Sequence, residues 1–123
     1  MQFLDSSVWL DHLANTSQDS SDVVNSDTLL FCSILSLFEI KKRIIKLGFS
    51  TEKVANSLSF IRNRSIIVNL TEEIIDSAVE ISITHNLAHI DSLIYASALS
   101  VEAELITADN DFRNLERVRI IKK

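Results

Sequence analysis

Short apolar runs rich in β-branched residues alternate with longer segments of helical spacing, and this alternation most constrains the fold. Strands are predicted at residues 2–4, 29–32, 65–70, 104–107 and 118–121. Helices are predicted near residues 8–13, 33–47, 51–62, 71–81 and 91–101, with a short helical turn within 109–115. Strands separated by helices pair in parallel and are covered on both faces. The sequence therefore predicts an α/β protein with one domain over residues 1–123, a three-layer α/β/α sandwich around a central, mostly parallel five-stranded sheet.

The pattern is least regular between the first two predicted strands. Residues 15–28 are polar and favour either a loop or a short, weak helix. In the helix at 33–47, Leu35, Phe38 and Ile45 are the predicted core positions. Gly48 is placed to end that helix in the left-handed conformation.

Glycine and proline are nearly absent, with one glycine and no proline in the chain. A Walker loop, a dinucleotide-binding glycine loop and a nucleophile elbow each need two or more glycines at fixed spacing, so all three are excluded. The single cysteine, Cys32, excludes an internal disulfide and a multi-cysteine zinc site, and it indicates a reducing compartment. The longest apolar stretch is too short to span a bilayer, and no basic residue precedes Lys41 as a secretory signal requires. We expect a soluble cytoplasmic protein with no membrane partner.

Basic residues are confined to two blocks, although the net charge is −5. Residues 41–64 hold seven lysines and arginines against one glutamate, and residues 113–123 hold five against one. Residues 1–40 and 65–112 hold fifteen acids and no lysine or arginine. This separation is compatible with a basic rim near an acidic pocket, and equally with ordinary solvated helix faces.

Four acids interrupt apolar stretches: Asp5, Glu39, Asp91 and Asp109. Asp5 follows the first predicted strand, and Asp109 lies two residues after the fourth. Ligands bind beyond the carboxyl ends of parallel strands, so the acids are expected to meet at that edge of the sheet. Two carboxylates at ~4 Å repel by about 4 kcal/mol, so such a cluster is either partly protonated or neutralised by a cation. Oxygen ligands favour Mg²⁺, with Mn²⁺ as a substitute, and phosphodiester hydrolysis most often uses this arrangement.

Each acid also has an ordinary structural explanation. Asp5 and Asp91 can act as helix N-caps, worth about 1 kcal/mol each. Glu39 can pair with a basic residue three or four positions later on its helix. Asp109 can simply make a turn. The sequence leaves these explanations open for each residue singly, and only convergence of the four favours a functional site.

The chain resembles a known family at four segments: FLDSSVWL at 3–10, SLFEI at 36–40, DSLIYASAL at 91–99 and LITADNDF at 105–112. These segments are similar to those of PIN-domain ribonucleases, most closely the VapC-type toxins of bacterial and archaeal toxin–antitoxin systems. The resemblance covers essentially the whole chain in the family's order and spacing. The chain departs from the family at residues 15–28, which are short and serine-rich where many relatives carry a firmer helix pair.

The resemblance implies a role for each matching residue. The implied catalytic acids are Asp5, Glu39, Asp91 and Asp109, with Asp5 and Asp91 as the leading metal ligands. The implied supporting residues are Ser6 and Thr107, whose hydroxyls hold the carboxylates, and the more peripheral Asp111. The implied activity is Mg²⁺-dependent endonucleolytic cleavage of RNA, often a structured RNA such as tRNA. A cognate antitoxin is the implied partner, and the implied assembly is a homodimer.

Two other functions remain open. A catalytically silent PIN fold could serve only for binding. A receiver domain also has an acidic pocket on a parallel sheet, but it would need an aspartate at the end of the third strand, where this chain has Asn69-Leu70. Metal-dependent RNA cleavage by the purified protein separates these readings from a nuclease.

Other residue types that can carry chemistry are weaker candidates. His85 and His89 have a zinc-binding spacing, but a helix break is predicted between them. Ser6 or Ser7 as a nucleophile lacks a glycine turn and an assignable histidine. Aromatic residues such as Trp9 are expected to pack in the core rather than to stack on bases.

Overall fold

The computed structural model describes residues 1–122, so Lys123, the last residue of the second basic block, lies outside the described residues. Its centre is a five-stranded sheet in the order β3-β2-β1-β4-β5, and every neighbouring pair of strands is parallel. The strands are β1 (Gln2–Leu4), β2 (Leu30–Ser33), β3 (Ile66–Val68), β4 (Glu104–Thr107) and β5 (Val118–Ile120). The predicted α/β class is confirmed, and the sheet is wholly parallel.

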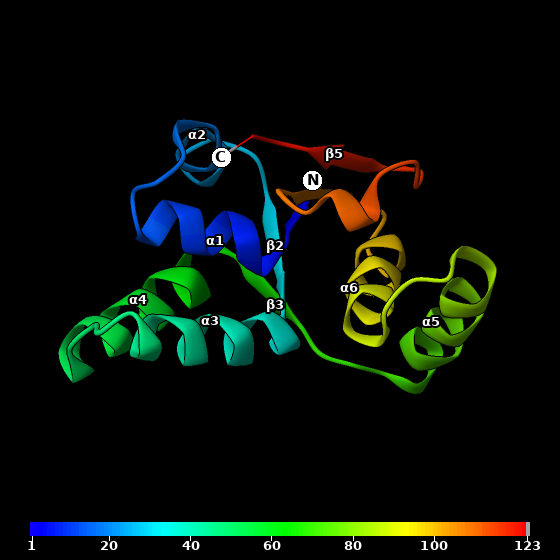
Figure 1. The fold of residues 1–123 in the computed structure, drawn as a ribbon, viewed down its shortest axis with the longest axis horizontal. Coiled ribbons are helices and arrows are strands. Elements are labelled where there is room, and N and C mark those ends of the chain that lie inside the picture. The colour runs from blue at the N-terminus through cyan, green and yellow to red at the C-terminus, as the bar shows by residue number, and fades with distance from the viewer. Residues whose placement is uncertain (123) are drawn as a thin grey trace.

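Helices cover both faces of the sheet, with α1 to α4 on one side and α5 and α6 on the other (Figure 1). The helices are α1 (Ser6–Leu13), α2 (Gln18–Val24), α3 (Ile34–Lys46), α4 (Thr51–Arg64), α5 (Glu72–His85) and α6 (His89–Ser100), followed by a 3₁₀ turn, η1 (Asn110–Phe112). Within residues 1–122, none of these helices has the length and apolar character needed to cross a bilayer.

Side chains of the strands alternate between two cores because successive residues of a strand point to opposite faces. Leu4, Cys32 and Ile106 face α1 to α4 and are fully buried. Phe3 and Leu105 face α6 and η1 on the other side and are also fully buried. The inner strands therefore lie between two apolar layers. A polar site can form only at the strand ends, and in parallel sheets it forms at the carboxyl ends.

The segment at residues 15–28 contains a regular helix, α2. The Ser17 side chain caps it by accepting a hydrogen bond from the backbone N–H of Ser20 at 3.2 Å. Val23 and Val24 are buried in the core shared with α1, while the rest of the helix is largely polar. Two apolar residues in one short helix are too few to produce a helical periodicity. For this reason the sequence could not distinguish a helix from a loop here.

Two of the three predicted core positions in α3 are wrong. Phe38 is 69% exposed and Ile45 is 53% exposed, while Leu35 is partly buried. The fully or nearly fully buried apolar side chains of α3 are Leu37, Ile40 and Ile44. The helix carries apolar residues on more than one side, so their spacing fits more than one buried stripe.

The junction between α5 and α6 places Asp91 inside a helix rather than at its start. Asn86 ends α5 in the left-handed conformation, with φ of 51°, and α6 begins at His89 with Ala88 at the N-cap. The predicted break between His85 and His89 is therefore confirmed. Asp91 lies in the first turn of α6, so the N-cap explanation for this residue is wrong. Gly48, with φ of 89°, follows α3 in the left-handed conformation as predicted.

Candidate active site

A hollow of about 690 Å³ lies at the carboxyl edge of the sheet between α1, α3 and α6. Asp5 reaches it from the end of β1, and Asp109 from the loop after β4. Glu39 reaches it from α3, and Asp91 from the first turn of α6. Four segments that are far apart in the sequence thus bring their acidic side chains to one hollow, as the ends of parallel strands allow.

Asp5 is held by hydroxyl groups and not by a helix cap. Its carboxylate is 8% exposed, and Oδ2 accepts hydrogen bonds from Thr107 Oγ1 at 2.8 Å and from Ser7 Oγ at 3.1 Å. Ser6 Oγ donates to Oδ1 over a longer distance of 3.4 Å. Asp5 occupies the N-cap position of α1, yet among residues 1–122 its side chain makes no capping hydrogen bond. The N-cap explanation for Asp5 is therefore not supported.

The two strong hydroxyl donors are themselves oriented by the backbone after β4. Ala108 N–H donates to Ser7 Oγ at 3.0 Å, and Asp109 N–H donates to Thr107 Oγ1 at 3.0 Å. Each hydroxyl accepts from the backbone and so has its proton free for the Asp5 carboxylate. Sequence reasoning named Ser6 and Thr107 for this role and missed Ser7. A hydroxyl two residues after the strand-terminal aspartate is the signal that could have identified it.

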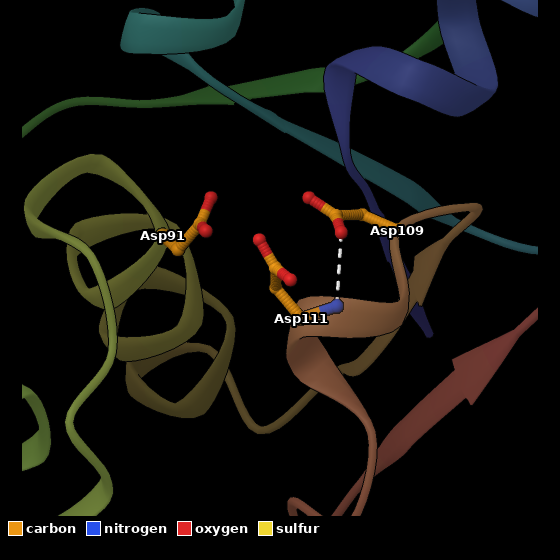
Figure 2. A group of neighbouring side chains, drawn as sticks. All are labelled: Asp91, Asp109 and Asp111. Carbon is orange, nitrogen blue, oxygen red and sulfur yellow. Dashed lines mark hydrogen bonds between the residues drawn. The ribbon is translucent and has the colours of Figure 1, made fainter.

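Asp91, Asp109 and Asp111 form a compact group beside Asp5. One carboxylate oxygen from each lies within 4.8 Å of the others. Figure 2 shows the three side chains turned toward a common space between α6 and η1. The backbone N–H of Asp111 donates to Asp109 Oδ1 at 2.9 Å, which fixes the Asp109 side chain. The 3₁₀ turn thus brings Asp111 into the group, although the family resemblance implied a more peripheral role for this residue.

The acids perturb one another because they lack partners of opposite charge. Among residues 1–122, the side-chain ion pair found joins Arg119 to Glu104 at 3.7 Å, so Glu39 is not paired with a basic residue. Burial, followed by repulsion from Asp109 and the other acids, raises the pKa of Asp91 to about 6. Burial and the charge of Asp5 raise the pKa of Glu39. Burial raises the pKa of Asp5, and the hydrogen bonds from Thr107 and Ser7 oppose that rise.

The donor set fits a hard divalent cation. The grouped ligand atoms are all carboxylate oxygens, which Mg²⁺ and Mn²⁺ prefer over softer ligands. Burial, and then repulsion from the other acids, raises the pKa of Asp91, and a bound cation would offset both effects. Arg43 also lines the hollow, so its rim carries a positive charge near the acids. This combination suits a phosphate-containing substrate.

Comparisons with known proteins agree with this geometry. The family model for the PIN domain matches residues 3–118. A toxin–antitoxin complex from Klebsiella pneumoniae contains a similar chain, with a TM-score of 0.84, 19% identity and 100% of both chains covered. VapBC2 from Rickettsia felis, bound to a DNA fragment from its promoter, gives a TM-score of 0.78 at 14% identity and covers 98% of this chain and 97% of that one.

A third solved structure is VapC20 from Mycobacterium tuberculosis, described as a toxin that cleaves the sarcin–ricin loop. It has a TM-score of 0.71 and 13% identity, and covers 91% of this chain and 92% of that one. At these identities the structural likeness establishes the fold. No curated protein matches the sequence.

The strand order also tests the receiver alternative. The order β3-β2-β1-β4-β5 differs from the order β2-β1-β3-β4-β5 of the flavodoxin-like class to which receivers belong, so the receiver alternative is wrong. The family match spans nearly the whole chain and includes all five acids of the hollow and its neighbouring group. This chain belongs to the PIN domain family.

Proposed function

We propose that this chain is a metal-dependent endoribonuclease and the toxin of a toxin–antitoxin pair. The observation that carries the proposal is the meeting of Asp5, Glu39, Asp91 and Asp109 in one hollow. A purely structural role does not account for this arrangement, because like charges held together oppose folding. The family match and the likeness to toxin structures support the same activity.

We propose Mg²⁺, with Mn²⁺ as a substitute, as the cofactor. Asp5 and Asp91 are the proposed leading ligands, and Asp109 and Asp111 lie close enough to Asp91 to complete the set. When bound, the ion supplies a Lewis acid that neutralises charge on the phosphate and lowers the pKa of a water molecule.

The chain's own groups are assigned the positioning and the proton transfer. Ser7 and Thr107 keep the Asp5 carboxylate in one orientation. Burial, and then the charge of Asp5, raises the pKa of Glu39, which is not a proposed metal ligand, so Glu39 is a better proton acceptor than an ordinary carboxylate. A water oxygen attacks phosphorus, its proton passes to Glu39, and the leaving oxygen takes up a proton from solvent as its bond to phosphorus breaks.

The proposed substrate is RNA, with a structured RNA such as tRNA as the expected class, and the proposed compartment is the cytoplasm. The first basic block places Lys42, Arg43 and Lys46 on α3 next to the hollow, where they can contact phosphates. A cognate antitoxin is the proposed protein partner. Its support is that solved structures of similar chains are toxin–antitoxin complexes.

We also propose a homodimer. Ile75, Val79 and Ile83 are spaced four residues apart on α5, and all three are exposed. They line an apolar hollow of about 320 Å³ shared with Leu93 of α6. A stripe of this kind on a helix of a monomer would be an aggregation liability, and pairing with a second copy would cover it.

Cleavage of RNA by the purified protein tests the proposed activity. Wild-type protein is expected to cut a mixed RNA substrate in Mg²⁺ and to stop when EDTA is added. Asp91→Asn is expected to abolish cutting, and the matched control Asp76→Asn, an exposed acid on α5, is expected to cut like wild type. Expression of wild type but not of Asp91→Asn should slow bacterial growth. Absence of cleavage by well-folded wild-type protein would instead favour a silent PIN fold used for binding.

A further inference from the structure

Helix α3 exposes a large aromatic side chain directly beside the acidic hollow. Phe38 precedes Glu39 in the sequence, and its side chain is 69% exposed. The sequence pattern placed Phe38 in the core, but Leu37 and Ile40 fill that position instead. Single exposed apolar side chains are common on protein surfaces. Phe38 differs because it lines a hollow among basic residues next to the acids.

Phe38 lines a second hollow, of about 460 Å³, that adjoins the acidic one. The two hollows share Leu10, Glu39, Arg43 and Leu47 in their walls, so they form one continuous groove. One end of the groove contains the acids, and the other contains the phenyl ring. A polymer that reaches the acids from this side must therefore pass Phe38.

The same end of the groove is strongly basic. Lys42 and Lys46 follow Phe38 at intervals of four residues, which places all three on one stripe of the helix. Arg43 stands one turn after Glu39 on the neighbouring stripe. Lys42, Arg43 and Lys46 all line the second hollow, and no carboxylate among residues 1–122 forms an ion pair with any of them. Glu39 is the acidic residue in this wall.

We propose that this end of the groove binds an unpaired nucleotide next to the cleaved phosphodiester bond. The Phe38 ring stacks on the base, and Lys42, Arg43 and Lys46 bind the phosphates on either side of it. Aromatic rings set among cations are how proteins hold single-stranded nucleic acids, since every base offers a face for stacking. The inference rests on the proposed nuclease function and narrows its substrate to RNA that is single-stranded at the cut, such as a loop or a bulge.

The chemistry of the groove favours RNA over an apolar protein segment as its occupant. An apolar helix laid over Phe38 would remove three charged groups from water without supplying an anion. A phosphate backbone supplies one anion per nucleotide and leaves the base free to stack. The spacing of the three cations along α3 suits a chain of repeated charges better than a single one.

Binding of RNA to two variants of Phe38 and one control variant tests the proposal. Every protein in the experiment, including the parent, carries Asp91→Asn, so that RNA is bound and not cut. The probe is a short fluorescein-labelled single-stranded RNA of mixed sequence. Phe38→Ala is expected to weaken binding on the order of ten-fold, since a stacked base contributes that much. Phe38→Trp is expected to restore binding. Ile45→Ala, at another exposed apolar position of α3, is expected to bind like the parent. A blunt duplex of the same sequence is expected to bind weakly to all of them.

The outcomes separate this inference from the proposed function. If wild-type protein cleaves RNA while Phe38→Ala binds and cleaves like wild type, the inference fails and the nuclease remains. If wild-type protein neither binds nor cleaves RNA in Mg²⁺, both fail together. If Phe38→Ala keeps RNA binding but loses its complex with a co-expressed antitoxin, the groove belongs to a protein partner and the inference is overturned. Equal binding of single strands and duplex would also overturn it.

Discussion

Replacing Asp91 by asparagine should stabilise the metal-free protein. The substitution keeps the shape of the side chain and removes one negative charge from the group formed with Asp109 and Asp111. Burial, and then repulsion from the other acids, raises the pKa of Asp91 from 3.8 to about 6. At neutral pH the folded protein must therefore hold an unfavourable charge that the unfolded chain holds without penalty.

Two opposing contributions set the size of this effect. A pKa rise from 3.8 to about 6 corresponds to roughly 3 kcal/mol, and solvent screening of this partly exposed group reduces it to about 1–2 kcal/mol. Asp91 also lies in the first turn of α6, where a negative charge favours the helix dipole by about 0.3–1 kcal/mol. The cost of burying this charge beside the other acids outweighs the favourable dipole interaction, so we expect a net gain of about 0.5–1.5 kcal/mol.

Urea unfolding of the metal-free protein at pH 7 measures this gain. Glu73→Gln is the matched control, because Glu73 is an exposed first-turn acid of α5, outside the hollow and the acidic group. This control is expected to lose a few tenths of a kcal/mol, the opposite sign. In Mg²⁺ at ten times its dissociation constant, wild type should gain about 1.4 kcal/mol and Asp91→Asn should gain much less. A clear loss of stability in Asp91→Asn, both with and without Mg²⁺, would refute the electrostatic reasoning and leave a structural role for Asp91.

Three further predictions follow from the site and the surface. The metal-free stability of wild type relative to Asp91→Asn should fall as pH rises from about 4 to 7. Because the pKa of Asp91 is higher in the folded state, the native protein binds an extra proton at low pH and loses this advantage above about pH 6. Urea titrations at several pH values check this, and a difference in stability that does not change with pH would contradict it. Thr107→Val should reduce cleavage and destabilise the fold by about 1–3 kcal/mol, because buried Asp5 loses its hydrogen-bond donor at 2.8 Å. Thr107→Ser should restore both the cleavage rate and the stability. Cleavage kinetics and urea unfolding of the two variants measure these effects. Ile83→Asp should convert a dimer to a monomer in sedimentation experiments. The monomer should keep its helical content by circular dichroism, since Ile83 is 80% exposed, and an unchanged dimer would place the interface elsewhere.

The fold class was predictable because it depends on alternation along the whole chain and not on any one residue. The meeting of Asp5 and Asp109 was predictable for the same reason, since parallel strands bring their carboxyl ends to one edge. Their catalytic role remains a proposal. The segment at 15–28 was ambiguous because α2 buries only two valines, too few for a periodic signal.

Details that depend on orientation were not predictable from the sequence. Phe38 and Ile45 fit a helical stripe as well as Leu37 and Ile44 do, and only the position of α3 on the sheet decides which stripe is buried. Asp111 joins the acidic group because η1 folds it back beside Asp109, a turn that spacing does not specify. Ser7 contributes through hydrogen bonds to residues a hundred positions away, which no local pattern contains.

Crystals of the protein soaked in Mn²⁺ test the central claim most directly, because anomalous scattering locates the ion without reference to activity. An ion coordinated by Asp91 together with one or more of Asp5, Asp109 and Asp111 is the predicted result. Soaked crystals with no Mn²⁺ at these carboxylates, or with Mn²⁺ held only by acids elsewhere on the surface, would contradict the assignment of this hollow as a metal-dependent nuclease site.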